Sequence, residues 1–123
     1  MIIAVDTGGT KTLVASFDDK GQIDQEFKFP TPKDTATYVH TLSQQLEAHF
    51  GADDVDAIVV ALPGIVKDGV AIWCNNLKWK NFDVGAALKG ILGGAPIYVD
   101  NDANLAGLAE TRQLATIPAL SLY

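Results

Sequence analysis

The chain has 123 residues, of which 48% are hydrophobic and 20% charged, and its formal net charge is −6. This composition is that of one globular domain with a core of its own, and the acidic balance disfavours nucleic acid and anionic membrane surfaces as partners. No apolar run reaches the length of a membrane span, and a single cysteine with two histidines disfavours a disulfide or a zinc site. We therefore expect a cytoplasmic protein.

The first half of the chain predicts three strands and one helix. Apolar runs or alternation predict strands at residues 2–6, 12–17 and 22–29. From Asp34 or Thr35 to Phe50 the apolar residues recur at helical spacing, and Gly51 fits the C-cap. Both histidines fall on this helix, where we expect exposed side chains rather than ligands.

The second half alternates between strands and helices. We expect strands at 55–61, 70–73 and 97–99, helices at 82–92 and 102–113, and a last strand at 118–123. Three consecutive strands followed by helix–strand alternation predict an α/β fold with a mixed sheet. The last predicted strand ends on apolar residues, with no polar segment or helix after it. Because a free strand end leaves backbone groups and apolar side chains without neighbours, we expect the N-terminal half of a longer protein.

The most informative motif is Asp6-Thr7-Gly8-Gly9-Thr10-Lys11, between the first two predicted strands. Glycine permits positive φ or a close approach of backbone to a ligand, and N–H groups, hydroxyls and an ammonium bind phosphate. Two interpretations stay open at this point. The segment is either a phosphate loop, with Asp6 facing the metal of the phosphate, or an ordinary hairpin turn.

A second polar segment, Asp100-Asn101-Asp102-Ala103-Asn104, follows a predicted strand. Ligands of α/β sheets bind at the carboxyl ends of strands. A carboxylate there can accept a proton from a substrate hydroxyl while the amides orient the substrate. The alternative is a helix N-cap, for which Asp and Asn are favoured.

Two weaker segments also have two interpretations. Leu62-Pro63-Gly64 is either a plain turn or a loop whose glycine lets backbone approach a small polar ligand. In Asn75-Asn76-Leu77-Lys78-Trp79, an aromatic ring near amides suits a sugar pocket, but a lone tryptophan more often packs in a core. Cys74 is expected to be a buried thiol.

In this order and spacing, these segments resemble the ROK family of sugar kinases, within the sugar kinase/Hsp70/actin superfamily. Residues 6–12 look like the first phosphate loop of the family and 61–66 like its sugar loop. Residues 76–79 look like its Asn-Leu-x-x-Trp region with one residue fewer, and 100–104 like its Glu-Asn-Asp-Ala-Asn segment. The resemblance implies that residues 1–123 are the N-terminal, ribonuclease-H-like domain of a two-domain kinase with an actin-like ATPase fold.

The resemblance also implies ATP-dependent phosphorylation of a hydroxyl of a hexose or amino sugar, as in a glucokinase. Asp102 would be the general base, and Asp6 would orient Mg²⁺ through water. The nucleotide phosphates would face Gly8, Gly9, Thr10, Lys11 and Thr12. The sugar would contact Gly64, Asn76, Asn101 and Asp102. Asp100 in place of the usual Glu, and Lys78 and Lys80 around Trp79, leave the identity of the sugar open.

Other parts of the family pattern would lie beyond Tyr123: the second phosphate loop, the zinc motif and the remaining sugar ligands. We therefore expect the isolated chain to be catalytically silent, with homo-oligomers or self-association of the truncated domain. The alternative from another class is a stand-alone, non-catalytic domain that binds sugar or a partner protein. A reading frame that continues past Tyr123 into a Gly-Thr-Gly loop favours the kinase, and a stop codon there favours the alternative.

Overall fold

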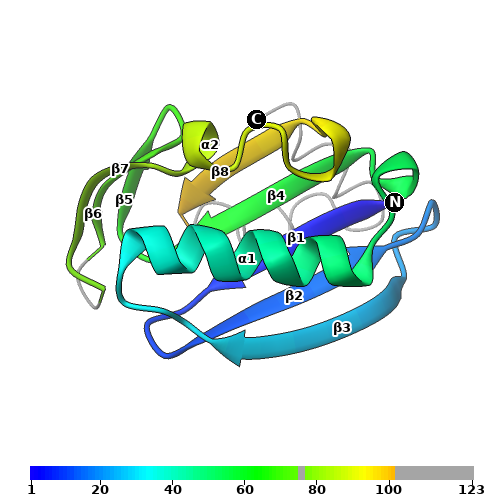
Figure 1. Cartoon of the computed structure of the whole chain (residues 1–123), viewed down its shortest axis with the longest axis horizontal. Helices are drawn as coiled ribbons and strands as arrows, with labels where there is room; N and C mark the ends of the chain where they lie inside the picture. Colours follow the sequence, from blue (N-terminus) through cyan, green and yellow to red (C-terminus); the bar gives the residue numbers. More distant parts are fainter. Residues whose placement is uncertain (75–76, 102–123) are drawn as a thin grey trace.

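The computed structural model of the chain describes residues 1–74 and 77–101, and its main element is a mixed sheet of five strands (Figure 1). The strands are β1 (Ile2–Thr7), β2 (Lys11–Phe17), β3 (Ile23–Pro30), β4 (Ala57–Leu62) and β8 (Ile97–Asn101). They lie in the order β3-β2-β1-β4-β8, with β1, β2 and β3 antiparallel and β4 and β8 parallel to β1. The predicted α/β fold with a mixed sheet is confirmed.

Helix α1 (Thr35–His49) covers one face of this sheet (Figure 1). It begins at Asp34, whose carboxylate accepts a hydrogen bond from the Thr37 N–H at 2.9 Å, as an N-cap does. Its buried stripe is Tyr38, Leu42 and Leu46. This stripe and alternate residues of the strands form the core: Ile3, Val5, Val14, Ile58, Val60 and Leu62. His40 and His49 are both exposed, as predicted.

The end of α1 differs from the prediction of a Gly51 C-cap. The C-cap is Phe50, in an extended conformation with φ −130°, and its N–H donates to the Leu46 carbonyl at 3.0 Å. Gly51 has φ −88°, so the left-handed conformation of a glycine cap is not used. The reason is burial: the Phe50 ring joins the core and lies 6.2 Å from the Phe27 ring, which sets the exit of the chain.

A second, three-stranded sheet follows β4, with β5 (Ile65–Lys67), β6 (Val70–Cys74) and β7 (Trp79–Asp83) in antiparallel order β5-β6-β7. It lies beside the N-terminal end of α1 (Figure 1). The Trp79 ring packs 4.7 Å from the Tyr38 ring of α1, which joins the two sheets through one core. Cys74 is buried, as expected. β5 and β7 were not predicted from the sequence.

The predicted helix over 82–92 is wrong for most of its length. Phe82 and Asp83 belong to β7, and α2 (Val84–Ala87) is a single turn followed by the 3₁₀ turn η2 (Ile91–Gly93). Gly90, Leu92 and Gly94 have φ of 90°, 50° and 86°, which a helix does not allow. A short η1 (Ala52–Asp54) joins α1 to β4.

The predicted helix at 102–113 and strand at 118–123 lie outside the described residues. Within the described part of the chain, no helix has the length and apolar character needed to cross a membrane.

Candidate functional site

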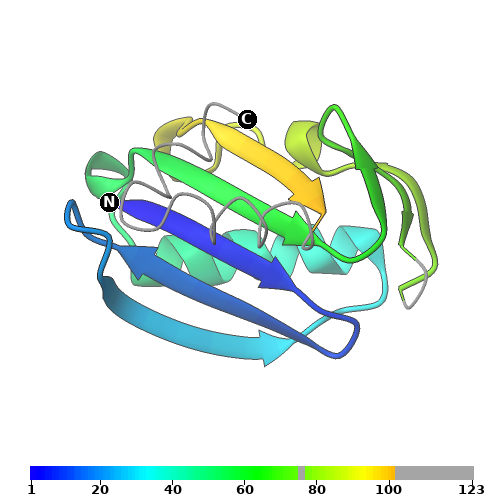
Figure 2. The same ribbon diagram turned by 180° about the vertical axis from the view of Figure 1, so that it is seen from behind.

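The carboxyl ends of β1, β4 and β8 lie at one edge of the main sheet, because the three strands are adjacent and parallel (Figure 2). Asp6 is in register with Ala61, and Ala61 with Asp100. The two carboxyl groups therefore lie on the same face of the sheet with one strand between them, about 10 Å apart at about 4.8 Å per strand. Thr7, beside Asp6, contacts α1, so this face is the one opposite α1.

The turn between β1 and β2 holds the predicted phosphate loop. The Gly8 N–H donates to the Lys11 carbonyl at 2.9 Å, and a Cβ atom on Gly8 would lie only 2.8 Å from that oxygen. Neither Gly8 nor Gly9 has a positive φ. The turn therefore needs Gly8 for a close approach of its own backbone, not for a left-handed conformation.

The tip of this turn carries donors suited to an anion. Among the described residues, no backbone or side-chain acceptor takes a hydrogen bond from the N–H of Gly9 or Thr10. Thr10 and Lys11 are exposed and add a hydroxyl and an ammonium. Adjacent backbone N–H groups beside a cation form the kind of concave donor set that holds phosphate oxygens.

Two pairs of buried hydroxyl groups stabilise the strand residues on either side of the turn. Thr7 Oγ1 lies 2.7 Å from the Tyr38 hydroxyl, and Thr12 Oγ1 lies 2.8 Å from Thr31 Oγ1. The Thr31 N–H also donates to the Thr10 carbonyl at 2.9 Å. Because Thr12 is fully buried, its hydroxyl serves the fold of the turn, and its contact with phosphate stays a prediction.

The Tyr38 hydroxyl is neutral in this setting. Burial raises the pKa of Tyr38 well above its ordinary value, the hydrogen bond with Thr7 opposes this rise, and nearby Cys74 adds to it. A neutral hydroxyl can both donate and accept, so the Thr7–Tyr38 pair leaves no buried polar atom unsatisfied.

Sequence reasoning missed Lys33, which contacts the turn directly, and did not foresee that Trp79 would hold Lys33. The Lys33 ammonium donates to the Gly9 carbonyl, and the Trp79 indole N–H donates to the Lys33 carbonyl at 2.8 Å. Trp79 is only 3% exposed, which supports the packing interpretation of this residue. Little in the sequence indicated Lys33, which is a lone cation between Pro32, after β3, and the Asp34 cap.

The residues predicted to bind sugar are described only in part. Gly64 lies in the loop after β4 with φ 112°, and its missing side chain makes room for the Trp73 carbonyl oxygen. Asn101 ends β8 and is half-buried, with its N–H on the Asp100 carboxylate at 2.7 Å. Asn76 and Asp102 lie outside the described residues. The sugar contacts of Gly64 and Asn101 stay predictions.

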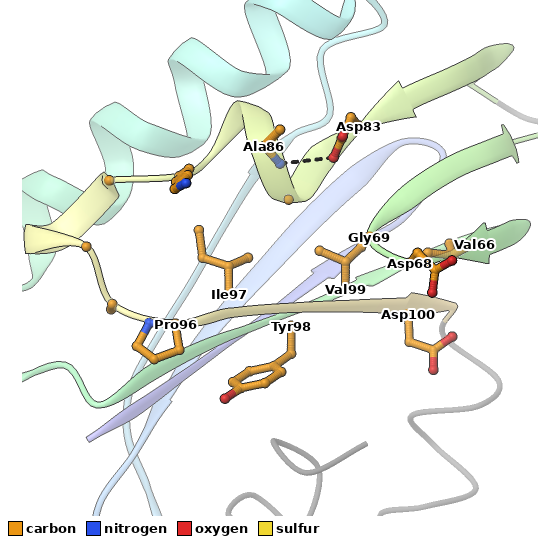
Figure 3. A pocket seen from close by; sticks show the side chains of 15 residues that line it. Val66, Asp68, Gly69, Asp83, Ala86, Pro96, Ile97, Tyr98, Val99 and Asp100 are labelled. Carbon is orange, nitrogen blue, oxygen red and sulfur yellow. Dashed lines mark hydrogen bonds between the residues drawn. The ribbon is translucent and has the colours of Figure 1, made fainter.

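An open pocket of about 880 Å³ lies along β8, between this strand, the β5–β6 turn and α2. Figure 3 shows Ile97 and Val99 directed toward α2, while Tyr98 and Asp100 are directed to the opposite face. None of the described residues predicted to bind phosphate or sugar lines this pocket. The candidate site is therefore the edge of the sheet where β1, β4 and β8 end. Asp100 lies at this edge and also lines the pocket.

Comparison with known proteins identifies the family of the chain. A model of the ROK family matches residues 2–117. The chain is 27% identical over 112 residues to a glucokinase of Streptomyces coelicolor, covering 89% of this chain and 35% of that protein. It is 35% identical over 113 residues to the N-acetylgalactosamine kinase AgaK of Shewanella sp., covering 89% of this chain and 36% of that protein.

A solved structure also matches the fold. It is the ROK family glucokinase of Streptomyces griseus in complex with glucose and AMPPNP, with a TM-score of 0.78 and 30% identity over 93% of this chain and 37% of that chain. The structural likeness confirms the actin-like ATPase fold that the resemblance implied. The chain spans about a third of the length of the curated relatives it matches.

Proposed function

This chain belongs to the ROK family, and we propose that residues 1–123 form the N-terminal domain of a two-domain, ATP-dependent sugar kinase. The observation that carries the proposal is the meeting of three strand ends at one sheet edge. The turn after β1 brings donors for phosphate, the loop after β4 brings Gly64, and the end of β8 brings Asn101. Phosphoryl transfer depends mostly on such positioning and on charge stabilisation.

In this proposal the β1–β2 turn holds the phosphates of ATP. The N–H groups of Gly9 and Thr10, the Thr10 hydroxyl and the Lys11 ammonium donate to phosphate oxygens. Asp6 lies beside the turn with an exposed side chain, and carboxylate oxygens are the ligands that Mg²⁺ takes in proteins, often through water. When bound, Mg²⁺ would neutralise part of the phosphate charge.

The sugar lies at the ends of β4 and β8. Asp102 follows Asn101 directly, and we assign Asp102 as the general base that accepts the proton of the attacking hydroxyl. Asn76 and Asn101 hydrogen-bond the sugar, and Gly64 lines its pocket. The base needs no raised pKa, because it takes the proton late, from an oxygen already bonding to phosphorus in a loose transition state. The acceptor is a hexose or an amino sugar, in keeping with the glucokinase and N-acetylgalactosamine kinase relatives.

A hybrid enzyme tests this assignment. The chain replaces the matching N-terminal third of the Streptomyces coelicolor glucokinase, and ADP release is measured over a panel of hexoses and amino sugars. We expect turnover by the hybrid, a loss of about 10²-fold or more in kcat with Asp102→Asn, and little change with Asp53→Asn, an exposed carboxylate in η1. Equal kcat in both variants would overturn the role of Asp102.

The isolated chain is expected to release no ADP with any sugar of the panel, because it spans about a third of its relatives. Robust turnover by the chain alone would contradict the two-domain proposal.

The small sheet exposes an apolar pair that favours self-association of the chain. Ile65 and Trp73 are cross-strand neighbours in β5 and β6, and they are 61% and 40% exposed. Sedimentation of the wild type and of Trp73→Ser tests this self-association. A wild type that stays monomeric at high concentration would contradict it.

A further inference from the structure

We propose that Lys33 is a second cationic ligand, beside Lys11, for the terminal phosphate of a triphosphate bound at the β1–β2 turn. This inference rests on the proposed function, because it needs the turn to bind phosphate. It adds a residue from a different part of the chain, the segment between β3 and α1.

The position of the ammonium carries the inference. Lys33 donates one hydrogen bond to the Gly9 carbonyl, at the tip of the turn, and its side chain is exposed. A lysine ammonium has three donors, so two remain for an anion that approaches the same tip. The N–H groups of Gly9 and Thr10, in the two peptide units on either side of Gly9, have no acceptor among the described residues. The Thr10 N–H points away from the Gly9 carbonyl, because the peptide unit that they share is trans, so the ammonium and this N–H lie on different sides of the same tip.

The backbone of Lys33 is fixed from both sides. The Trp79 indole holds its carbonyl oxygen at 2.8 Å, and Trp79 itself is packed against Tyr38 at 4.7 Å between ring centres. On the other side, Asp34 caps α1. A ligand therefore meets an ammonium whose attachment point is already ordered, which lowers the entropic cost of binding.

Two cations and two carboxylates lie near this tip. The Asp34 carboxylate is engaged with the helix: it accepts from the Thr37 N–H at 2.9 Å and from the Thr37 hydroxyl at 3.0 Å. The hydrogen bond from the Thr37 backbone is the main cause that lowers the pKa of Asp34. Lys11 and Lys33 bring two positive charges to the turn, and the second carboxylate, Asp6, would face a bound Mg²⁺.

The competing explanation is that Lys33 only steadies the turn through the Gly9 carbonyl. An exposed hydrogen bond of this kind contributes little to stability, since water competes for both groups. The two explanations differ in salt dependence. A contact between an ammonium and a phosphate weakens as salt rises, whereas a loss of turn geometry weakens binding at every salt concentration.

Isothermal titration of the 123-residue chain separates them, with Lys33→Gln compared with Lys28→Gln. Lys28 is exposed on β3, opposite Leu13, so the control removes the same charge from the neighbouring strand. The probes are MgATP and inorganic tripolyphosphate, which share a chain of phosphates but differ in the nucleoside. We expect Lys33→Gln to weaken both by about three- to tenfold at low salt, and Lys28→Gln to leave both nearly unchanged.

At about 1 M NaCl, where the Debye length is about 3 Å, we expect the ratio of the Kd values of the Lys33 and Lys28 variants to shrink toward one. At low salt, Lys33→Arg should restore most of the affinity. Weakening of MgATP alone would overturn the inference, because Lys33 would then act on the nucleoside part.

Two other results also overturn it while the proposed function stands: equal affinities of the Lys33 and Lys28 variants, or a loss in Lys33→Gln that is the same at every salt concentration. If the wild type binds neither probe, this inference fails, while the proposed function is decided separately by turnover of the hybrid enzyme.

Discussion

The carbonyl oxygen of Trp73 lies where a side chain of Gly64 would begin: a Cβ atom built on Gly64 would be 2.2 Å from that oxygen. The loop after β4 therefore passes directly against the β6 backbone. Gly64 also has φ 112°, a conformation that residues with side chains rarely adopt. This contact explains why the loop needs glycine, and it ties the predicted sugar loop to the small sheet.

Gly64→Ala should destabilise the protein strongly. We expect a loss of about 3–5 kcal/mol in the free energy of unfolding, because backbone must shift and the φ is strained. Urea unfolding followed by tryptophan fluorescence measures it. Gly90→Ala is the matched control, since Gly90 has φ 90° but nothing within 4 Å of its Cβ position, and should cost about 1–2 kcal/mol. Equal losses in both variants would show that the contact with Trp73 is absent.

Gly8→Ala should distort the β1–β2 turn. Its Cβ would lie 2.8 Å from the Lys11 carbonyl, so the turn must open, at a cost of about 1–3 kcal/mol. We also expect weaker binding of tripolyphosphate, measured by calorimetry. Gly51→Ala is the control, because its nearest neighbour is the movable Asp54 carboxylate at 3.3 Å. Unchanged affinity in Gly8→Ala would contradict a phosphate-binding turn of this geometry.

The Thr7–Tyr38 pair should show coupling in a double-mutant cycle. Thr7→Val or Tyr38→Phe alone leaves a buried hydroxyl without its partner and should cost about 1–3 kcal/mol. The double variant should cost less than the sum, with a coupling of about 1 kcal/mol. Strict additivity would mean that the two hydroxyls do not interact.

Stability should fall at alkaline pH because of Tyr38. Its pKa is raised in the folded protein, while in the unfolded chain a tyrosine titrates near pH 10. The stabilising contribution is thus complete below about pH 10 and is lost as pH rises above that value, because only the unfolded chain releases the proton. Urea midpoints of wild type and Tyr38→Phe, compared at neutral pH and above pH 10, should converge. Parallel curves would contradict the burial of this hydroxyl.

Trp79→Phe should keep most of the packing but lose the hydrogen bond to the Lys33 carbonyl. We expect a loss of about 1 kcal/mol or slightly more in the free energy of unfolding, against about 3–5 kcal/mol for Trp79→Ala. Thermal unfolding of the two variants tests this order. A phenylalanine variant as unstable as the alanine variant would show that the indole N–H dominates.

The parts of the fold that the sequence predicted are those with strong local patterns. The apolar run of β1, the alternation in β3 and the helical spacing of Tyr38, Leu42 and Leu46 in α1 each favour one kind of element. The missed strands lack such patterns. β7 contains Lys80, Asn81 and Asp83, and it is held by its pairing with β6 and by the burial of Trp79.

The candidate site could be predicted as motifs but not as an arrangement. The sequence pointed to Asp6, Gly64 and Asn101 as ends of strands, and the parallel order of β1, β4 and β8 brings those ends together. Lys33 was beyond sequence reasoning, because its contact with Gly9 crosses between the turn after β1 and the segment after β3. The glycines of the turn were predicted for the right place but partly for the wrong reason, since Gly8 serves a close approach without a positive φ.

The most direct test of the central claim is a titration of the isotope-labelled 123-residue chain with MgATP, followed by amide NMR. We predict that the largest shifts occur at Gly8, Gly9, Thr10 and Lys11, with smaller shifts at Asn101. The β3 residues around Lys28 should stay unmoved. Binding of MgATP that shifts other amides and leaves Gly9 and Thr10 unchanged would contradict the assignment of this turn as the phosphate loop of a ROK sugar kinase.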